Sequence, residues 1–167
     1  GLAFGLATPA SITSLISEDI VALGELGNVL ASLPLVLTAI LIFVKNASVL
    51  VLSFALSPIF CLVPILALTV NGWVIAIVSA IAVEEESLGF VLAALLPHGI
   101  IELSALILGE AAALSFGTLA ILSLFKKENR NLLLPNFRQN LRYLVIALAL
   151  LIPAAIIETF VTPLFLK

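Results

Sequence analysis

Long apolar runs separated by short polar segments dominate the chain. Four such runs lie at about 33–57, 62–83, 88–125 and 141–166. Each has at least the roughly 20 residues that one helical crossing of a bilayer needs. The pattern therefore predicts an all-α, polytopic helical membrane protein with its spans in these ranges. Lys45 and Asn46 interrupt the first run, which could bend there into two short helices.

The third run is nearly twice as long as one crossing requires, and it contains the segment Pro97-His98-Gly99. A proline inside a helix removes a backbone donor and kinks or breaks the helix. We therefore expect a broken or re-entrant helix, with a half-helix at 88–96 and a full crossing from about Gly99. A break would expose free amide groups at the start of the second helix, and these would stabilise Glu102 in its first turn.

The first 32 residues show a different pattern. Residues 1–7 are almost entirely apolar and lack a preceding basic region, so we expect the tail of a truncated first span rather than a signal peptide. Residues 10–32 carry apolar positions such as Ile12, Ile16 and Leu23 along one side at helical spacing. This predicts an amphipathic helix outside the bilayer, lying on its surface or against a partner.

The basic residues indicate the cytoplasmic side. Five of the seven lysines and arginines lie within 126–142, which the positive-inside rule makes a cytoplasmic loop. Within it, residues 129–138 have the composition of an ordinary polar loop. Acidic clusters near the start of the chain and at 84–86 are compatible with the outside. The predicted threading has five spans, counting a complete first one, and leaves the C terminus outside.

Composition excludes a water-soluble domain. Of the 167 residues, 63% are hydrophobic and 10% are charged, whereas a soluble domain has roughly 25% charged residues. The net charge of −3 gives no reason to expect a nucleic-acid partner, and the single Cys61 cannot form an internal disulfide. The sequence contains no phosphate-binding loop and no nucleophile with a matching base, so an enzyme is not favoured. The partner it does predict is the lipid bilayer.

Polar side chains inside the predicted spans are costly unless they are paired, and ionisable ones indicate function. Six residues meet this description: Asn46, Asn71, His98, Glu102, Glu110 and Glu158. His98 and Glu102 lie one turn apart on one helical face. At ~1.5 Å per residue, Glu158 can share their layer, whereas Asn71 lies nearer the midplane and could hydrogen-bond across helices from below. Glu110 lies about two turns deeper than Glu102 and about 80° around the helix; like the two asparagines, it is expected to be a supporting residue.

One histidine and two carboxylates at a similar depth are open to three interpretations. His98, Glu102 and Glu158 could bind a divalent metal such as Zn²⁺, which accepts nitrogen and oxygen ligands. They could instead relay protons or ions, or form a structural hydrogen-bonded group that holds the helices together. The segment lacks the second histidine and the catalytic glutamate of an H-E-x-x-H helix. Further protein ligands would have to come from a second subunit.

The order and spacing of these residues resemble the stage II sporulation protein M family. The resemblance rests on four elements: Lys45-Asn46, Asn71-Gly72, the segment from Leu96 to Ala105 with its P-H-G-x-x-E pattern, and the segment from Ile157 to Pro163. It covers the chain from about residue 30, and residues 1–29 match only in layout. It implies a small membrane protein of bacteria or archaea, usually with five spans. The bacterial sporulation member anchors peptidoglycan-remodelling enzymes at the membrane during engulfment.

Two functions compete at this point. The resemblance implies a membrane scaffold or anchor, homo-oligomeric and most simply a dimer. Such a scaffold would recruit an unknown membrane or envelope protein through the external amphipathic helix or the basic inner loop. The polar residues favour a metal-binding or ion-translocating protein instead, since interrupted helices near binding sites are typical of transporters. Five spans are few for a transporter, so this alternative also predicts a dimer.

Overall fold

The computed structural model describes residues 33–164, and the regular structure of this part of the chain is entirely helical. Its elements are α4 (Leu35–Leu56), α5 (Val63–Glu85), α6 (Leu88–Phe125), η1 (Lys127–Asn129), α7 (Arg130–Ile156), η2 (Ile157–Val161) and η3 (Thr162–Leu164). Within residues 33–164, four helical stretches are long and apolar enough to cross a membrane. The predicted all-α polytopic membrane protein is thereby confirmed. The predicted tail at 1–7 and the amphipathic helix at 10–32 lie outside the described residues.

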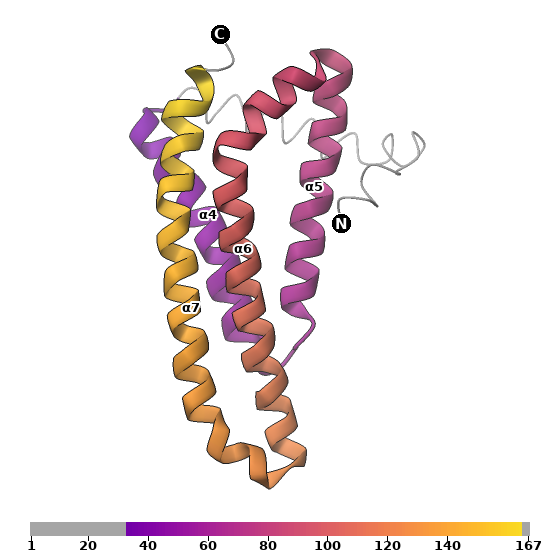
Figure 1. Cartoon of the computed structure of the whole chain (residues 1–167), viewed down its shortest axis with the longest axis vertical. Coiled ribbons are helices and arrows are strands. Elements are labelled where there is room, and N and C mark those ends of the chain that lie inside the picture. Colours follow the sequence, from indigo (N-terminus) through magenta and orange to yellow (C-terminus); the bar gives the residue numbers. More distant parts are fainter. Residues whose placement is uncertain (1–32, 165–167) are drawn as a thin grey trace.

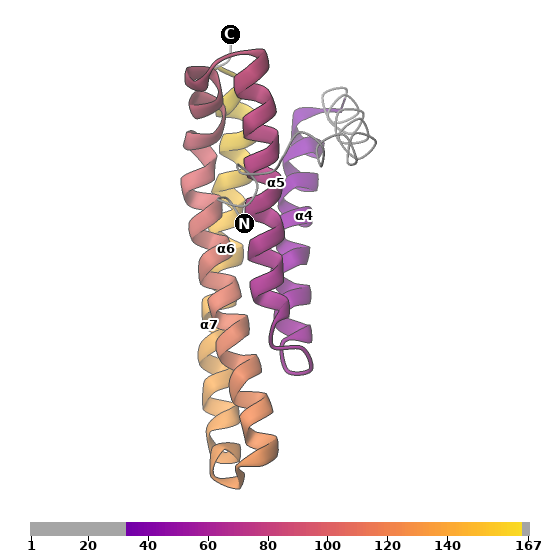
Figure 2. The ribbon, with the colours of Figure 1, turned by 90° about the vertical axis from the view of Figure 1, so that its right-hand side faces the viewer.

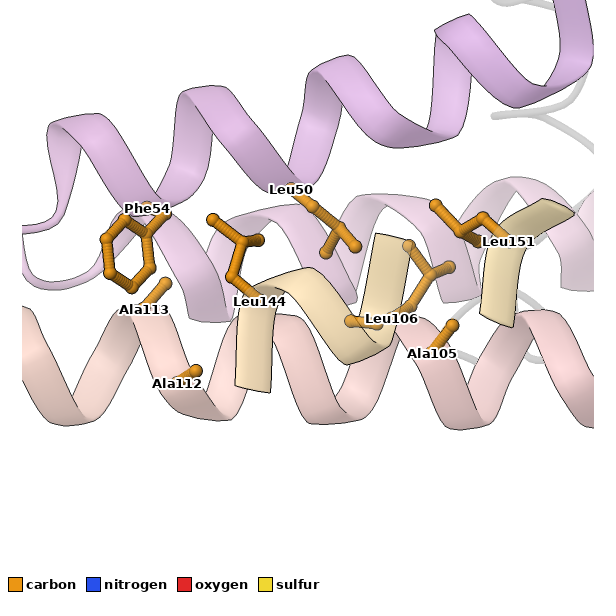
Figure 3. Packing of buried hydrophobic residues seen from close by; sticks show 9 residues of the cluster. Leu50, Phe54, Ala105, Leu106, Ala112, Ala113, Leu144 and Leu151 are labelled. Atoms are coloured by element: carbon orange, nitrogen blue, oxygen red, sulfur yellow. The ribbon is translucent and has the colours of Figure 1, made fainter. Parts of the chain in front are cut away.

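The apolar core lies between α4, α6 and α7. Helices α6 and α7 run side by side over most of their length, and α4 packs against both (Figures 1 and 2). Figure 3 shows the core side chains that meet there: Leu50 and Phe54 from α4, Ala105, Leu106, Ala112 and Ala113 from α6, and Leu144 and Leu151 from α7. Helix α5 lies at the edge of the bundle. Large apolar side chains are exposed on all four long helices, as expected of surfaces that face lipid.

Three aromatic rings mark the level at which α4 ends. Phe54 stacks on Phe116 with ring centroids 5.2 Å apart, and Phe137 contacts both rings. Beyond this level, the end of α6 and the start of α7 continue past α4 and α5 as a helical hairpin (Figures 1 and 2). We call residues 118–136 the projecting hairpin. Around its turn at η1 lie Lys126, Lys127 and Arg130, three of the five basic residues that the sequence assigned to the cytoplasmic loop. The other two, Arg138 and Arg142, lie further along α7.

Helix α6 is bent rather than broken. The prediction of separate helices before and after Pro97 is wrong in this respect, because helical backbone continues from Leu88 to Phe125 with Pro97 inside it. The first turns of α6 run obliquely to the rest in Figure 1. A proline ring pushes on the carbonyl four residues earlier, and a bend relieves this contact without ending the helix. Glu102 therefore does not lie at a free helix start, and its stabilisation comes from elsewhere.

Two further expectations also differ from the structure. Helix α4 is continuous through Lys45 and Asn46 rather than split into two. Residues 130–138, expected to be a polar loop, form the first turns of α7. Tertiary contacts explain the second difference, since this stretch packs along the end of α6. Arg130 Nε donates to the Ser123 carbonyl at 3.3 Å, and Asn140 Nδ2 donates to Ser115 Oγ at 3.3 Å.

Candidate functional site

His98, Glu102 and Glu158 lie together in the structure. Each offers one ligand atom, and the three atoms all lie within 4.8 Å of one another. His98 and Glu102 come from successive turns of α6, just past Pro97, while Glu158 comes from η2 at the end of α7. His98 is only 9% exposed. A nitrogen ligand and two carboxylates in this arrangement match the donor types of zinc sites.

A π-helical turn positions Glu158. Residues Ile157–Val161 leave the α-helical pattern, and the Thr162 amide donates to the Ile157 carbonyl five residues back. Pro163 follows directly and has no amide donor, so the regular hydrogen-bond ladder cannot continue there. Such π turns inside helices recur at functional sites, because the extra residue turns a side chain toward a new direction. Here the turn carries one of the three clustered residues.

Thr162 lies within hydrogen-bonding distance of one ring nitrogen of His98. The Thr162 hydroxyl donates to the Ile157 carbonyl at 3.3 Å, so its oxygen is free to accept a hydrogen bond from His98 Nδ1, which lies 3.2 Å away. This arrangement favours the tautomer with the proton on Nδ1, which leaves a lone pair on Nε2. Metal-binding histidines are commonly held in this way, with one nitrogen donating to a second residue and the other free for the metal.

Asn46 joins α4 to the cluster. Its Nδ2 donates to Glu102 Oε1 at 2.7 Å, which leaves the second oxygen of Glu102 available. The Asn46 side chain is only 4% exposed, and its Oδ1 has no hydrogen-bond partner within residues 33–164. A buried carbonyl oxygen without a donor is costly, and such groups usually bind water or an ion. We call His98, Glu102, Glu158 and Asn46 the polar cluster.

The polar cluster brings two carboxyl groups together with little basic charge to balance them. Glu102 and Glu158 act electrostatically on each other, and the only basic side chain that acts on Glu158 among the described residues is the exposed Lys45. Neither carboxylate forms an ion pair with lysine or arginine in this part of the chain. Carboxylates at membrane depth require a compensating cation or proton. The cluster thus combines potential ligand atoms with two carboxyl groups that have no ion-pair partner among the described residues.

The other two predicted residues lie outside the polar cluster. Glu110 is 2% exposed and accepts a hydrogen bond from Ser53, within the apolar core below the cluster. Leu50 of α4, fully buried, comes between Asn46 and Ser53 along that helix. Asn71 Nδ2 donates to a carbonyl of its own helix, Ala67 O, at 2.9 Å, and not across helices as expected. Glu110 Oε1, like Asn46 Oδ1, has no hydrogen-bond partner within residues 33–164, but no second ligand residue lies beside it in a metal-binding group among these residues.

Sequence reasoning missed Thr162 and the role of Asn46 as a hydrogen-bond partner of Glu102. Thr162 resembles an ordinary helical threonine, and only the adjacent Pro163 signals that the helix changes there. Asn46 and Glu102 are 56 residues apart, and His98 and Thr162 are 64 apart. Contacts of this range cannot be derived from helical spacing. They require the relative rotation of the helices.

These features define a polytopic helical membrane protein with an ionisable cluster enclosed by three of its helical segments. The profile of the stage II sporulation protein M family matches residues 1–163, and the chain belongs to this family. It is also similar to an uncharacterized protein of Methanocaldococcus jannaschii, with 27% identity over 164 residues that cover 98% of this chain and 88% of that protein. No solved structure matches the chain significantly.

Proposed function

We propose that this membrane protein binds one divalent cation in the polar cluster. The observation that carries the proposal is the approach of three ligand atoms, from His98, Glu102 and Glu158, to within 4.8 Å of one another. A single ion can contact all three after small side-chain rotations. Mixed imidazole and carboxylate ligands suit Zn²⁺ and related transition metals better than Mg²⁺, which prefers oxygen ligands alone.

Charge balance supports a divalent ion. Two carboxylates repel each other strongly where the surroundings exclude water. An ion of charge +2 would neutralise both, and the Asn46 carbonyl oxygen would gain a partner directly or through a bound water. The competing explanation is a proton shared between the carboxylates, which would make the polar cluster a proton-binding group without metal.

Measuring the metal content of the purified protein distinguishes a bound divalent cation from a shared proton. The protein is purified without chelators and without a histidine tag, and its metals are measured by plasma mass spectrometry. We expect about one Zn²⁺ or similar ion per chain or per dimer, lost in His98→Ala, Glu102→Gln and Glu158→Gln. Glu110→Gln is the matched control, because it removes a buried carboxylate of the same helix outside the polar cluster. Metal absent from every sample, or equally present in all of them, contradicts the proposal.

A scaffold role is the second candidate, and the projecting hairpin favours it. The end of α6 exposes Leu124 and Phe125 with 71% and 81% of their surfaces accessible, beside Lys126 and Lys127. Exposed apolar side chains next to basic ones, beyond the level where α4 ends, are suited to contact a membrane-associated or envelope partner. In this role the chain acts as an oligomeric anchor that recruits the partner to the membrane.

Site-specific crosslinking in native membranes tests recruitment. A photoreactive residue at Phe125 should give a discrete crosslinked protein species. The same group at Ile100, which is 63% exposed on the membrane-level part of α6, is the control and should give lipid products only. If neither position gives a crosslinked protein species and only the monomeric chain is detected, the result contradicts both self-association and recruitment through the hairpin.

A further inference from the structure

The outer face of α7 forms an open groove at the base of the projecting hairpin. Its volume is about 580 Å³, and it is lined by Arg138, Leu141, Arg142, Val145 and Ile146. All five side chains are exposed, and of the three apolar ones Leu141 is the least exposed, at 39%. The buried residues of α7 lie on the opposite side of the helix, toward α6 and α4. The groove therefore faces away from the bundle.

The groove lies where α7 passes from polar to apolar surroundings. Phe137, the residue before Arg138, contacts Phe54 near the end of α4. After Arg142 the chain has no charged residue until Glu158. At ~1.5 Å per residue, Ile146 lies about 12 Å further along the helix than Arg138. The two arginines are thus at the membrane boundary, and the apolar half of the groove extends toward the bilayer interior.

Both guanidinium groups are unpaired among the residues that the structure describes. Within residues 33–164 neither Arg138 nor Arg142 forms a hydrogen bond or ion pair, whereas Arg130 donates to the Ser123 carbonyl. The two arginines are one helical turn apart on one face, about 6 Å along the axis. Guanidinium groups bind phosphate with paired hydrogen bonds, and two of them at this spacing can hold one phosphodiester.

We propose that this groove is a binding site for an anionic phospholipid. The headgroup phosphate is held by Arg138 and Arg142, and one acyl chain lies along Leu141, Val145 and Ile146. Charge complementarity selects an anionic headgroup, and the apolar half of the groove selects a lipid over a free phosphate. The site is independent of the polar cluster, because the two share no residue.

Native mass spectrometry of the detergent-solubilised chain tests the proposal. Phosphatidylglycerol and phosphatidylcholine with identical acyl chains are added in turn, and bound lipid is counted. We expect the phosphatidylglycerol adducts to fall roughly tenfold to thirtyfold in Arg138→Gln/Arg142→Gln, from the loss of two interfacial cations. The matched control, Lys126→Gln/Lys127→Gln, removes two positive charges from the hairpin turn and should retain binding. Unchanged circular dichroism shows that the variants fold.

Four other results would contradict the proposed lipid-binding site. Equal losses in the arginine and lysine variants would mean diffuse electrostatic attraction. Equal binding of both lipids would mean that the headgroup charge is not recognised. Displacement of the lipid by millimolar glycerol phosphate would identify a site for soluble phosphate. Undiminished phosphatidylglycerol binding in the arginine variant would show that Arg138 and Arg142 do not hold the lipid.

Discussion

Thr162 shows how one hydroxyl group can determine the chemistry of a buried histidine. It accepts from His98 Nδ1 because its own proton is already donated to the Ile157 carbonyl. The tautomer favoured by this contact keeps the lone pair of His98 on Nε2, the nitrogen that Thr162 does not contact. A threonine acting through a histidine in this way is a positioning residue, and its effect should appear in ligand affinity.

Replacing Thr162 with valine should weaken metal binding without unfolding the protein. Valine keeps the shape of threonine but cannot accept from His98 Nδ1, so the ring loses its orientation. Loss of such a partner typically lowers metal affinity about 10- to 100-fold. A competition titration with a chromophoric zinc chelator measures the change.

Thr159→Val is the control for this substitution. Thr159 is also buried in η2, and its hydroxyl donates only to the Ala155 carbonyl. Its removal should leave the zinc dissociation constant within about twofold of the wild-type value, because metal affinity depends on partners of the ligands. Equal weakening in both variants would show that the π turn, and not the His98 contact, sets the affinity.

At the scale of elements, the close approach of α4 and α6 depends on small residues. A Cβ atom at Gly117 would lie 2.7 Å from the backbone carbonyl carbon of Ser57, at the end of α4. A Cβ atom at Gly109 would lie 2.7 Å from Leu50 Cδ2, the end of a flexible side chain. Both glycines thus allow the helices to touch, but only Gly117 faces backbone.

Gly117→Ala should therefore destabilise the protein more than Gly109→Ala. Alanine gains about 0.5–1 kcal/mol over glycine in a helix interior, and overpacking against a rigid neighbour costs about 1–3 kcal/mol. We expect the thermal unfolding midpoint in detergent to fall for Gly117→Ala and to change little for Gly109→Ala, where Leu50 can move. A higher midpoint for Gly117→Ala would mean that the end of α4 shifts freely.

At the scale of the whole molecule, the order of helices places the chain connections on alternate sides of the membrane. Cys61, in the turn between α4 and α5, lies at the same end of the bundle as the projecting hairpin (Figure 1). The turn between α5 and α6, at Glu86, lies at the other end. The basic hairpin predicts that the end with Cys61 is cytoplasmic.

Cysteine labelling checks this orientation. A membrane-impermeant maleimide added to intact cells should label Glu86→Cys in a Cys61→Ser background and should leave Cys61 unlabelled until the cells are opened. Lys127→Cys in the same background should behave like Cys61. The Cys61→Ser protein without an introduced cysteine is the negative control and should not be labelled. Labelling of Glu86→Cys and Cys61 from the same side would contradict a crossing by α5.

Sequence information was sufficient for the class of protein and for the composition of its site. Apolar length and scarce charge leave helices in a bilayer as the one arrangement that satisfies the backbone. Helical spacing placed His98 and Glu102 on one face, and residue counting placed Glu158 at a compatible depth. These are consequences of local geometry, in which each residue advances a helix by a constant rise and rotation.

Packing between distant segments decided the course of the helices and the hydrogen-bond partners of the polar cluster. The sequence around Pro97 is compatible with a break or with a bend, and the structure shows helical backbone that continues through it. The polar composition of 130–138 is compatible with a loop, yet packing against α6 makes it helical. The partners Asn46 and Thr162 join the site from 56 and 64 residues away. Such contacts depend on how whole helices rotate and slide against one another, and no local propensity encodes that.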